Sequence, residues 1–351
     1  MTSSTLSLDC LRRVQDTLQR RVASRDPGNI VSVGFAPQRR DSPPHATSPE
    51  QDSRVVAQFD VSRKRKRVSE DKRIQSIEPV RLLDRRSRSY RELHLGTDVV
   101  EVGEIIPTGV RISTPDEHAT TSLVVRWTTV RPVPPRPTHH HPDDPRWRWG
   151  VMTVSHLFAG RGERDATSRA RVRRVAACGH GPDAVNGRVT RRARIPGGPD
   201  IALVETGWDR LWLSGFVPEI GLPPLVIPTE ADLTRWTSRG ASGTFVGDRV
   251  THDWKWRAFY PSLLIPSLGQ LQHLVSYQFQ AGSGATNAIE PFGPGSSGGV
   301  ILAEGVVLGM QVAAMKPDFH IGYAQSLDVS TAWLKKQFKA SALEVVHVVD
   351  R

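Results

Sequence analysis

From about residue 115 onward, the chain is a succession of short apolar segments separated by turn residues. These segments have the length and alternation of β-strands, and they are SLVVRWTTV (122–130), WGVMTVSHLF (149–158), IALVET (201–206), GTFVGDRVTHDWKWRAFY (243–260), HLVSYQF (273–279), GVILAEGVVLGMQVAA (299–314) and HIGYAQSL (320–327). Glycine (29) and proline (26) are plentiful, which favours many short strands joined by turns over a helical bundle. We therefore predict an all-β main body that closes with an amphipathic helix over 330–340.

The front of the chain has a different pattern, with one helix-like segment ahead of three strand-like ones. In residues 7–24 apolar side chains recur on one face at helical spacing, and Ser7 is a candidate N-cap. Strand-like runs follow at 29–35, 54–61 and 97–105. The intervening residues 36–54 are rich in Pro, Ser, Asp and Arg, which predicts a disordered loop. This pattern predicts a small α/β segment.

A chain of 351 residues with 38% hydrophobic residues can bury a sizeable core in one large or two ordinary domains. We divide it into a basic N-terminal α/β segment (1–112), a main domain (113–340) and a C-terminal tail (341–351). The sequence has no apolar run near the roughly 18 residues of a membrane-spanning helix, so we expect no membrane association.

The net charge of +11 is concentrated in two segments. Residues 1–100 carry 20 basic and 13 acidic side chains, and residues 151–200 carry 10 arginines against 4 acidic side chains. A nucleic acid or an acidic partner would fit such a distribution. A solvated basic surface is the simpler interpretation, and we favour it.

The cysteines and the start of the chain indicate an intracellular protein. Cys10 lies in the front segment and Cys178 in an arginine-flanked stretch, which makes a structural disulfide a poor expectation. The first 30 residues lack the apolar core of a secretory signal. We expect a cytoplasmic location. The basic run Arg63–Arg67 also fits a nuclear-import signal, although a charged hairpin loop accounts for it equally well.

Three separate stretches contain residues with the chemistry of a nucleophilic site. His156 ends an apolar strand in TVSHL, Asp200 opens one in DIALV, and Ser297 stands among glycines in GPGSSGG. A serine hydroxyl becomes a nucleophile when an adjacent base takes its proton and a carboxylate orients that base. Each residue alone has an ordinary structural explanation: a core histidine, a strand-start aspartate and a surface serine turn. Protein families that share this chemistry place the three residues in different orders along the chain, so the order His, Asp, Ser helps to distinguish between those families.

The three stretches resemble, in sequence and in order, the TAAHC, DIAL and GDSGG blocks of the chymotrypsin-like (trypsin-like) serine proteases. VVLGMQVAA resembles the strand that lines the substrate cleft of that family, and GYAQSLDVSTAWLKKQF resembles its last strand and C-terminal helix. The resemblance covers roughly residues 115–340. It implies two antiparallel six-stranded β-barrels, with a boundary near 225–235 and the site in the cleft between them.

The resemblance also implies a role for each site residue. Ser297 would be the nucleophile, His156 the general base and Asp200 the residue that holds the imidazole. The backbone N–H groups of Gly295 and Ser297 would form the oxyanion hole. Substrate would contact six residues in two segments: Pro291, Phe292, Gln311, Val312, Ala313 and Ala314.

The sequence departs from the family pattern in three places. Ser296 replaces the aspartate that pairs with a cleavage-generated N-terminus in secreted members, so we expect activity without that cleavage. The disulfide framework is missing, as in HtrA-type or viral members. Pro291 stands where a basic-specific enzyme carries a pocket carboxylate, with Glu290 one position away. This departure predicts a preference for apolar or small residues before the scissile bond.

The front segment resembles the N-terminal region of trypsin-like proteins related to plant narrow-leaf proteins, through NIVSVGFAP, RVVAQFDVSRKRKR and LGTDVVEVGE. In those proteins an α/β segment precedes the protease barrels. The basic run within 62–73 belongs to this region.

We therefore predict a serine endopeptidase that needs no cofactor and acts on protein or peptide substrates. Two alternatives remain: an inactive trypsin-like pseudoprotease that binds peptides or partners, and a basic protein associated with nucleic acid through 60–91 and 161–194. The run His139-His140-His141 with Asp143 and Asp144 could hold a metal ion, but a solvent-exposed loop is the better interpretation, so we predict no metal.

Overall fold

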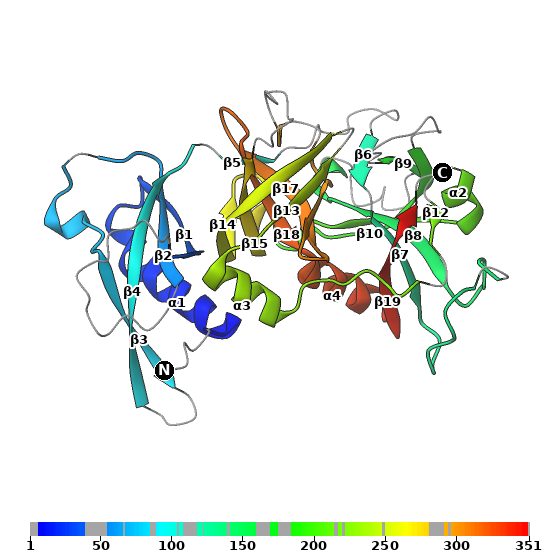
Figure 1. Ribbon diagram of the computed structural model, residues 1–351, viewed down its shortest axis with the longest axis horizontal. Helices are drawn as coiled ribbons and strands as arrows, with labels where there is room; N and C mark the ends of the chain where they lie inside the picture. The colour runs from blue at the N-terminus through cyan, green and yellow to red at the C-terminus, as the bar shows by residue number, and fades with distance from the viewer. Residues whose placement is uncertain are drawn as a thin grey trace.

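The computed structural model shows a chain built mainly of β-strands (Figure 1). The residues that it describes are 6–38, 55–65, 67–84, 89–103, 105–107, 118–121, 123–138, 141–158, 169–174, 184–213, 217–219, 222–247, 250–280, 291–293 and 296–349. Along the view of Figure 1 lie, in turn, the N-terminal segment (blue to cyan), a central barrel (yellow to orange) and a sheet that is mostly green.

The central barrel, here called the second barrel, is a closed ring of six antiparallel strands. They are β13 (Ser242–Gly247), β14 (Val250–Ile265), β15 (Gly269–Gln280), β16 (Val300–Ala303), β17 (Val306–Met315) and β18 (Ile321–Ser326). The order is β13-β16-β17-β18-β15-β14, and pairing of β14 with β13 closes the ring. Large aromatic side chains fill its interior, among them Phe245, Trp254 and Tyr277. The predicted six-stranded barrel is confirmed here.

The mostly green part of the chain, together with a red strand from its C-terminal region, forms a seven-stranded sheet, here called the first sheet. Its strands are β6 (His118–Thr121), β7 (Leu123–Thr128), β8 (Arg148–Thr153), β9 (Arg169–Arg174), β10 (Ala184–Arg192), β11 (Ala202–Thr206) and β19 (Ala342–Val346). All neighbours are antiparallel except β6 and β9, which are parallel. The sheet thus has one more strand than the six expected. No pairing among the described residues closes it into a ring.

The additional strand comes from the region that we expected to be a C-terminal tail. β19 pairs with β7 over five residues, and Val345 and Val346 are buried. A further short pair joins β12 (Val217–Pro218) to β20 (Val348–Val349). Burial of apolar side chains offsets the entropy of ordering this end of the chain.

The N-terminal segment is an α/β unit, as predicted. It contains α1 (Leu8–Arg21), β1 (Ile30–Pro37), β2 (Val55–Val61), β3 (Ile77–Asp84) and β4 (Ser89–Glu101). The apolar face of α1 is buried, and the side chain of Ser7 accepts the N–H of Cys10. β1 pairs with β14 opposite Phe259, so the sheet of this segment continues into the second barrel.

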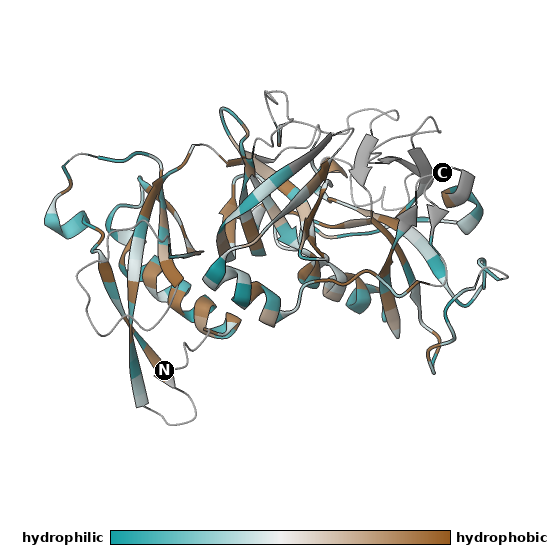
Figure 2. Ribbon diagram, viewed as in Figure 1, coloured by the Kyte–Doolittle hydropathy of each residue, from teal (hydrophilic) through white to brown (hydrophobic). Residues whose placement is uncertain are grey.

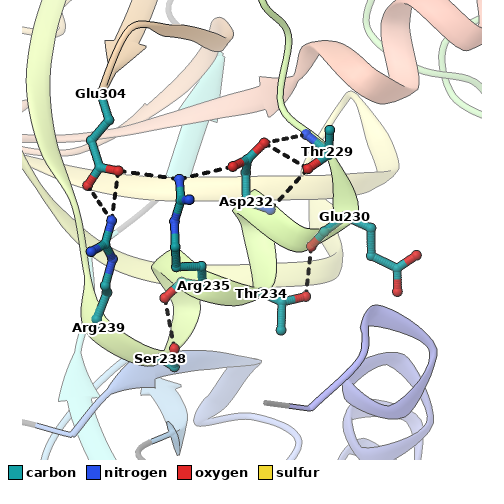
Figure 3. Close-up of polar contacts among 8 residues, drawn as sticks. All are labelled: Thr229, Glu230, Asp232, Thr234, Arg235, Ser238, Arg239 and Glu304. Atoms are coloured by element: carbon teal, nitrogen blue, oxygen red, sulfur yellow. Dashed lines mark hydrogen bonds and ion pairs between the residues drawn. The ribbon is translucent and has the colours of Figure 1, made fainter.

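A helix between the first sheet and the second barrel, α3 (Glu230–Arg239), was not predicted. Its N-terminus has a reciprocal cap, in which the Thr229 hydroxyl accepts the N–H of Asp232 and the Asp232 carboxylate accepts the N–H of Thr229 (Figure 3). Arg235 and Arg239 both pair with Glu304, in the turn between β16 and β17 (Figure 3). The ion pairs therefore connect α3 to the hairpin that leads into β17.

Figure 2 shows brown, apolar residues in strands of the N-terminal segment, the second barrel and the first sheet. One core cluster spans both bodies, with Trp149 and Val151 from the first sheet and Tyr260 and Leu274 from the second barrel. The predicted closing helix is α4 (Leu327–Phe338), which packs next to β17, β18 and β19. The two bodies are therefore joined by a shared apolar core.

The remaining short elements are β5 (Ile105–Pro107), α2 (Trp208–Leu213) and three 3₁₀ turns, at Ala23–Arg25, Glu70–Lys72 and His156–Phe158. Within the part of the chain that the structure describes, no helix has the length and apolarity needed to cross a membrane.

Candidate active site

His156 and Asp200 are brought together by the pairing of two adjacent strands. β8 ends three residues before His156, and β11 begins two residues after Asp200. The strands are antiparallel, with Thr153 opposite Ala202, so the end of one lies beside the start of the other. Asp200 is fully buried and His156 is 7% exposed.

The Asp200 carboxylate uses both oxygens to hold the histidine. Oδ1 accepts the backbone N–H groups of Ser155 (2.8 Å) and His156 (2.9 Å), and Oδ2 lies 2.5 Å from His156 Nδ1. Since an ionised carboxylate can only accept hydrogen bonds, Nδ1 carries the proton of the neutral ring, and Nε2 is left as an acceptor. This arrangement fixes both the tautomer and the orientation of the imidazole.

Ser297 completes the arrangement from the second barrel. Its Oγ lies 3.0 Å from His156 Nε2, within hydrogen-bond distance. With Nε2 as acceptor, the serine hydroxyl donates. The structure therefore brings together the three residues that the sequence motifs singled out, in a continuous chain from carboxylate to imidazole to hydroxyl.

The turn that carries Ser297 is held by backbone hydrogen bonds to β17. Gly298 N–H donates to the carbonyl of Gln311 (2.9 Å), and Gln311 N–H donates to the carbonyl of Gly299 (2.8 Å). Gly298 has a φ of +88°, a conformation that residues with a Cβ rarely adopt. The glycine after Ser297 is therefore a requirement of this turn.

Ser296, the neighbouring serine, is directed elsewhere. Its hydroxyl donates to the carbonyl of Phe292 (2.9 Å), and its N–H donates to the carbonyl of Gly293 (3.1 Å). Through these two bonds, Ser296 closes the turn ahead of the candidate nucleophile. Of the two adjacent serines, it is Ser297 that has its hydroxyl at the histidine.

Gln325 of β18 is a site residue that the motifs did not indicate. Its Oε1 accepts the backbone N–H of Asp200 at 2.8 Å, and its Nε2 donates to the carbonyl of Gln272 at 3.2 Å. Gln325 is buried and belongs to the second barrel, whereas Asp200 belongs to the first sheet. Its position in GYAQSL carries no sequence signal for this role.

The structure places the residues that we expected to bind substrate in buried positions. Phe292 is fully buried, and its ring packs edge-on against Phe245 and Tyr277 in the interior of the second barrel. Its ring is thus part of the barrel core, where we had expected a pocket wall. Pro291 is also buried.

The four expected residues of β17 are buried as well. Gln311 donates from Nε2 to the carbonyl of Ala313 (2.8 Å). Val312 and Ala313 belong to the cluster shared by the two bodies, and Ala314 belongs to the barrel interior. The backbone of Ala313 and Ala314 pairs with β5.

Several expectations concern residues outside those that the structure describes. They are Gly295 of the oxyanion hole, Glu290 and the rest of 286–290, His139 and His140 of the candidate metal run, and Cys178. Cys10 is a free thiol. Among the described residues, no group of three or more His, Cys, Asp or Glu side chains is arranged to hold a metal ion.

A second buried polar cluster joins the N-terminal segment to the second barrel. The Asp60 carboxylate of β2 accepts hydrogen bonds from Ser32 of β1 (2.5 Å), Gln58 (2.8 Å) and Tyr260 of β14 (2.7 Å). Burial raises the pKa of Asp60, and the hydrogen bonds from Ser32, Tyr260 and Gln58 oppose that rise. Burial likewise raises the pKa of Tyr260, with a further contribution from the Asp60 charge.

Comparison with known proteins gives matches at the level of structure only. No family model and no curated protein matches the chain. The structure is similar to that of the Rv3671c protease from M. tuberculosis in its active form, with a TM-score of 0.32, 15% sequence identity, and coverage of 63% of this chain and 81% of that one. The structure is also similar to that of Cellulomonas bogoriensis chymotrypsin, and the similar structures named here are those of chymotrypsin-like serine proteases.

Two further similar structures are the Nocardiopsis protease NAPase and Thermobifida fusca Protease A. The first has a TM-score of 0.31 and 13% identity and covers 60% of this chain and 88% of its own. The second has a TM-score of 0.31 and 14% identity and covers 57% of this chain and 85% of its own. The similarity is distant, and the chemistry of the site follows from its own hydrogen bonds.

Proposed function

We propose that the protein is a serine endopeptidase that hydrolyses peptide bonds through an acyl-enzyme, with Ser297, His156 and Asp200 as its catalytic triad. One observation carries the proposal: the continuous hydrogen-bond chain from Asp200 Oδ2 through the His156 ring to Ser297 Oγ, with distances of 2.5 and 3.0 Å. A hydroxyl beside an oriented, neutral imidazole is the arrangement that acyl transfer requires.

In the acylation step, Ser297 Oγ attacks the carbonyl carbon of the scissile bond as its proton moves to His156 Nε2. Asp200 stabilises the imidazolium, which then donates the proton to the leaving amine as the C–N bond breaks. In deacylation, a water molecule attacks the ester carbonyl carbon and gives its proton to His156, which returns it to Ser297 Oγ. We assign the oxyanion hole to the N–H groups of Gly295 and Ser297, as the GPGSSGG motif predicts.

The activity needs no N-terminus generated by cleavage. Ser296 offers no carboxylate to such an amine, and its hydroxyl already closes the turn ahead of Ser297. The hydrogen-bond chain of the triad is formed with the N-terminal segment in place. We also propose that the protein works in a reducing, intracellular compartment, because its two cysteines do not suit a structural disulfide.

A second candidate function is a peptide-binding pseudoprotease. The burial of Ser297, which is 1% exposed, favours it, because a nucleophile must reach its substrate. Endopeptidase activity is the better-supported function, since the imidazole is already oriented and has its acceptor nitrogen at the serine.

The deciding experiment is labelling of the purified protein with a fluorophosphonate probe. Wild-type protein and Ser296→Ala should both be labelled, and Ser297→Ala should not. Ser296→Ala is the matched control, because it removes the adjacent hydroxyl and its turn-closing bond to Phe292 but keeps all three triad side chains. Labelling of Ser297→Ala at the wild-type rate would show that the nucleophile is a different residue. Failure of a folded wild type to react would favour the pseudoprotease.

A further inference from the structure

The short strand β5 (Ile105–Pro107) is joined to β17 beside the candidate active site. The two are antiparallel, with Pro107 opposite Ala313, Ile106 opposite Ala314 and Ile105 opposite Met315 (Figure 1). β5 comes from the end of the N-terminal segment, while β17 is the strand expected to contact substrate.

β5 lies on the same edge of β17 as the turn that carries Ser297. A strand has two edges, and β18 occupies one of them from Gly309 to Ala314. The other edge first pairs with β16 and then, through Gln311, with Gly298 and Gly299. β5 continues that edge at Ala313, only two residues beyond Gln311, or roughly 7 Å along a strand.

Close packing accompanies the pairing of β5 with β17. Ile105 is 4% exposed and lies in the same apolar cluster as Val312 and Ala313. At Gly103 the chain approaches the end of β17 so closely that an added Cβ would lie 2.1 Å from the carbonyl oxygen of Lys316. Only glycine permits that approach without a shift of the backbone.

We propose that β5 is a built-in competitor that occupies the edge of β17 to which an extended peptide substrate must add as a strand. An incoming peptide gains affinity from main-chain hydrogen bonds to such an edge, and β5 already uses the edge at residues 313–315. The N-terminal segment thereby inhibits the site in cis. The substrate class is an extended peptide with an aliphatic side chain where Ile105 now packs. This proposal rests on the proposed function.

The anchoring of β5 supports an occupant in cis. β4 ends at Glu101, so only a few residues separate β5 from a strand that is paired on both sides, with β2 and β3. A tethered segment has an effective concentration on the order of millimolar. A free peptide therefore has to compete with a segment that never leaves the neighbourhood of the site.

The first test compares peptide hydrolysis with hydrolysis of a small ester that does not need the strand edge. Gly103→Ala and Ile105→Asp should each release β5 and raise kcat/KM for an extended peptide about tenfold or more relative to kcat/KM for the ester. The controls are Gly28→Ala, where an added Cβ meets nothing within 4 Å, and Val31→Asp on the exposed side of β1. An unchanged ratio in both folded variants would overturn the proposal.

The second test measures binding and does not depend on catalysis. A fluorescent peptide with the sequence of residues 101–107 is titrated into Ser297→Ala protein with and without Gly103→Ala. The proposal predicts at least tenfold tighter binding when Gly103→Ala is present. Equal affinity in the two folded proteins would overturn it. If wild type, Gly103→Ala and Ile105→Asp are all inactive on both peptide and ester while the predicted gain in binding is observed, the endopeptidase function is refuted and the occupancy by β5 is left intact.

Circular dichroism and thermal melting establish that each variant is folded. If Gly103→Ala does not fold, Ile105→Asp replaces it in both tests. Hydrogen exchange of the wild-type protein gives a further measurement that needs no substitution. β18 also protects β17 at Ala313 and Ala314, so the informative amides are those of Ile105 and Ile106 in β5. They should exchange slowly, and exchange as fast as in an unpaired strand would contradict the proposal.

Discussion

The backbone N–H of Asp200 donates to Gln325 Oε1 at 2.8 Å, so a side chain of the second barrel holds the carboxylate residue of the candidate site just before β11 of the first sheet. Gln325 is held in turn by its bond to the Gln272 carbonyl. The orientation of His156 therefore depends on both bodies of the protein, and on how closely they pack. We therefore expect Gln325 to act through Asp200 as a positioning residue.

Replacing Gln325 with methionine should lower kcat for peptide hydrolysis with little change in KM. The variant keeps the side-chain length but leaves the buried N–H of Asp200 without this acceptor, at a cost of about 1–3 kcal/mol. A decrease in kcat of roughly tenfold corresponds to 1.4 kcal/mol. Gln278→Met, at an exposed position of β15, is the matched control. Wild-type kcat in a folded Gln325→Met protein would rule out the positioning role.

Asp200→Asn should retain the fold and lower kcat by roughly 10⁴, because the amide favours the wrong imidazole tautomer. The measurement combines circular dichroism with hydrolysis rates for wild type and variant. Asp209→Asn, an exposed carboxylate in α2, should leave the rate unchanged. A loss of only a few-fold in Asp200→Asn would mean that the histidine is oriented by other groups.

The stability of the protein should fall as pH rises through the native pKa of Asp60. Burial raises that pKa above 3.8, so the contribution of the group is fully present below the unfolded value and is lost as pH rises through the raised value. At pH values between the unfolded and the native pKa, only the native state holds the proton, and the free energy of unfolding falls by about 1.4 kcal/mol per pH unit. Chemical denaturation of wild type and Asp60→Asn over pH 3–8 measures the difference.

In this experiment the asparagine variant should lack that part of the pH dependence, since its amide does not titrate. Asp253→Asn, at an exposed position of β14, serves as the control and should follow the wild-type curve. A curve for Asp60→Asn that is parallel to that of the wild type at every pH would contradict the assignment.

Thr229→Ala should destabilise the protein by about 1 kcal/mol, because it removes the side-chain cap of α3. Thr229→Ser keeps a hydroxyl at the same position and should recover most of the loss. Urea unfolding of the three proteins tests this expectation. If the alanine and serine variants are equally stable, the reciprocal cap in Figure 3 does not contribute.

The residue before the scissile bond should be apolar or small. A buried basic side chain would need a carboxylate partner, and Pro291 provides none at the position where the motif predicts one. A panel of fluorogenic peptides that differ only at this residue measures the preference. Fastest cleavage after arginine or lysine would indicate that Glu290 supplies the charge.

The sequence was sufficient to identify the elements with strong local patterns. The helical spacing in α1 and the apolar runs of β2 and β11 predicted those elements close to their observed bounds. The three candidate catalytic residues were found from short motifs at strand ends. These motifs can be recognised in the sequence because adjacent residues specify the turn or strand end that carries each side chain.

Strands with few apolar residues escaped prediction. β9 and β10 are rich in arginine, and β3 combines Glu78, Pro79 and Arg81 with its apolar residues. Their sequences lack the clear alternation of a half-buried strand, and they form strands because neighbouring strands supply hydrogen-bond partners.

The tertiary structure alone decided which segments lie side by side. β19 returns from the end of the chain to pair with β7, β5 pairs with β17, and Phe292 packs in the barrel interior. The Gln325 contact to Asp200 likewise joins residues far apart in the chain. Side-chain chemistry and local periodicity can be read from neighbouring residues. Pairing depends on backbone edges and buried surface contributed by distant segments, so it becomes determined only when the chain is folded.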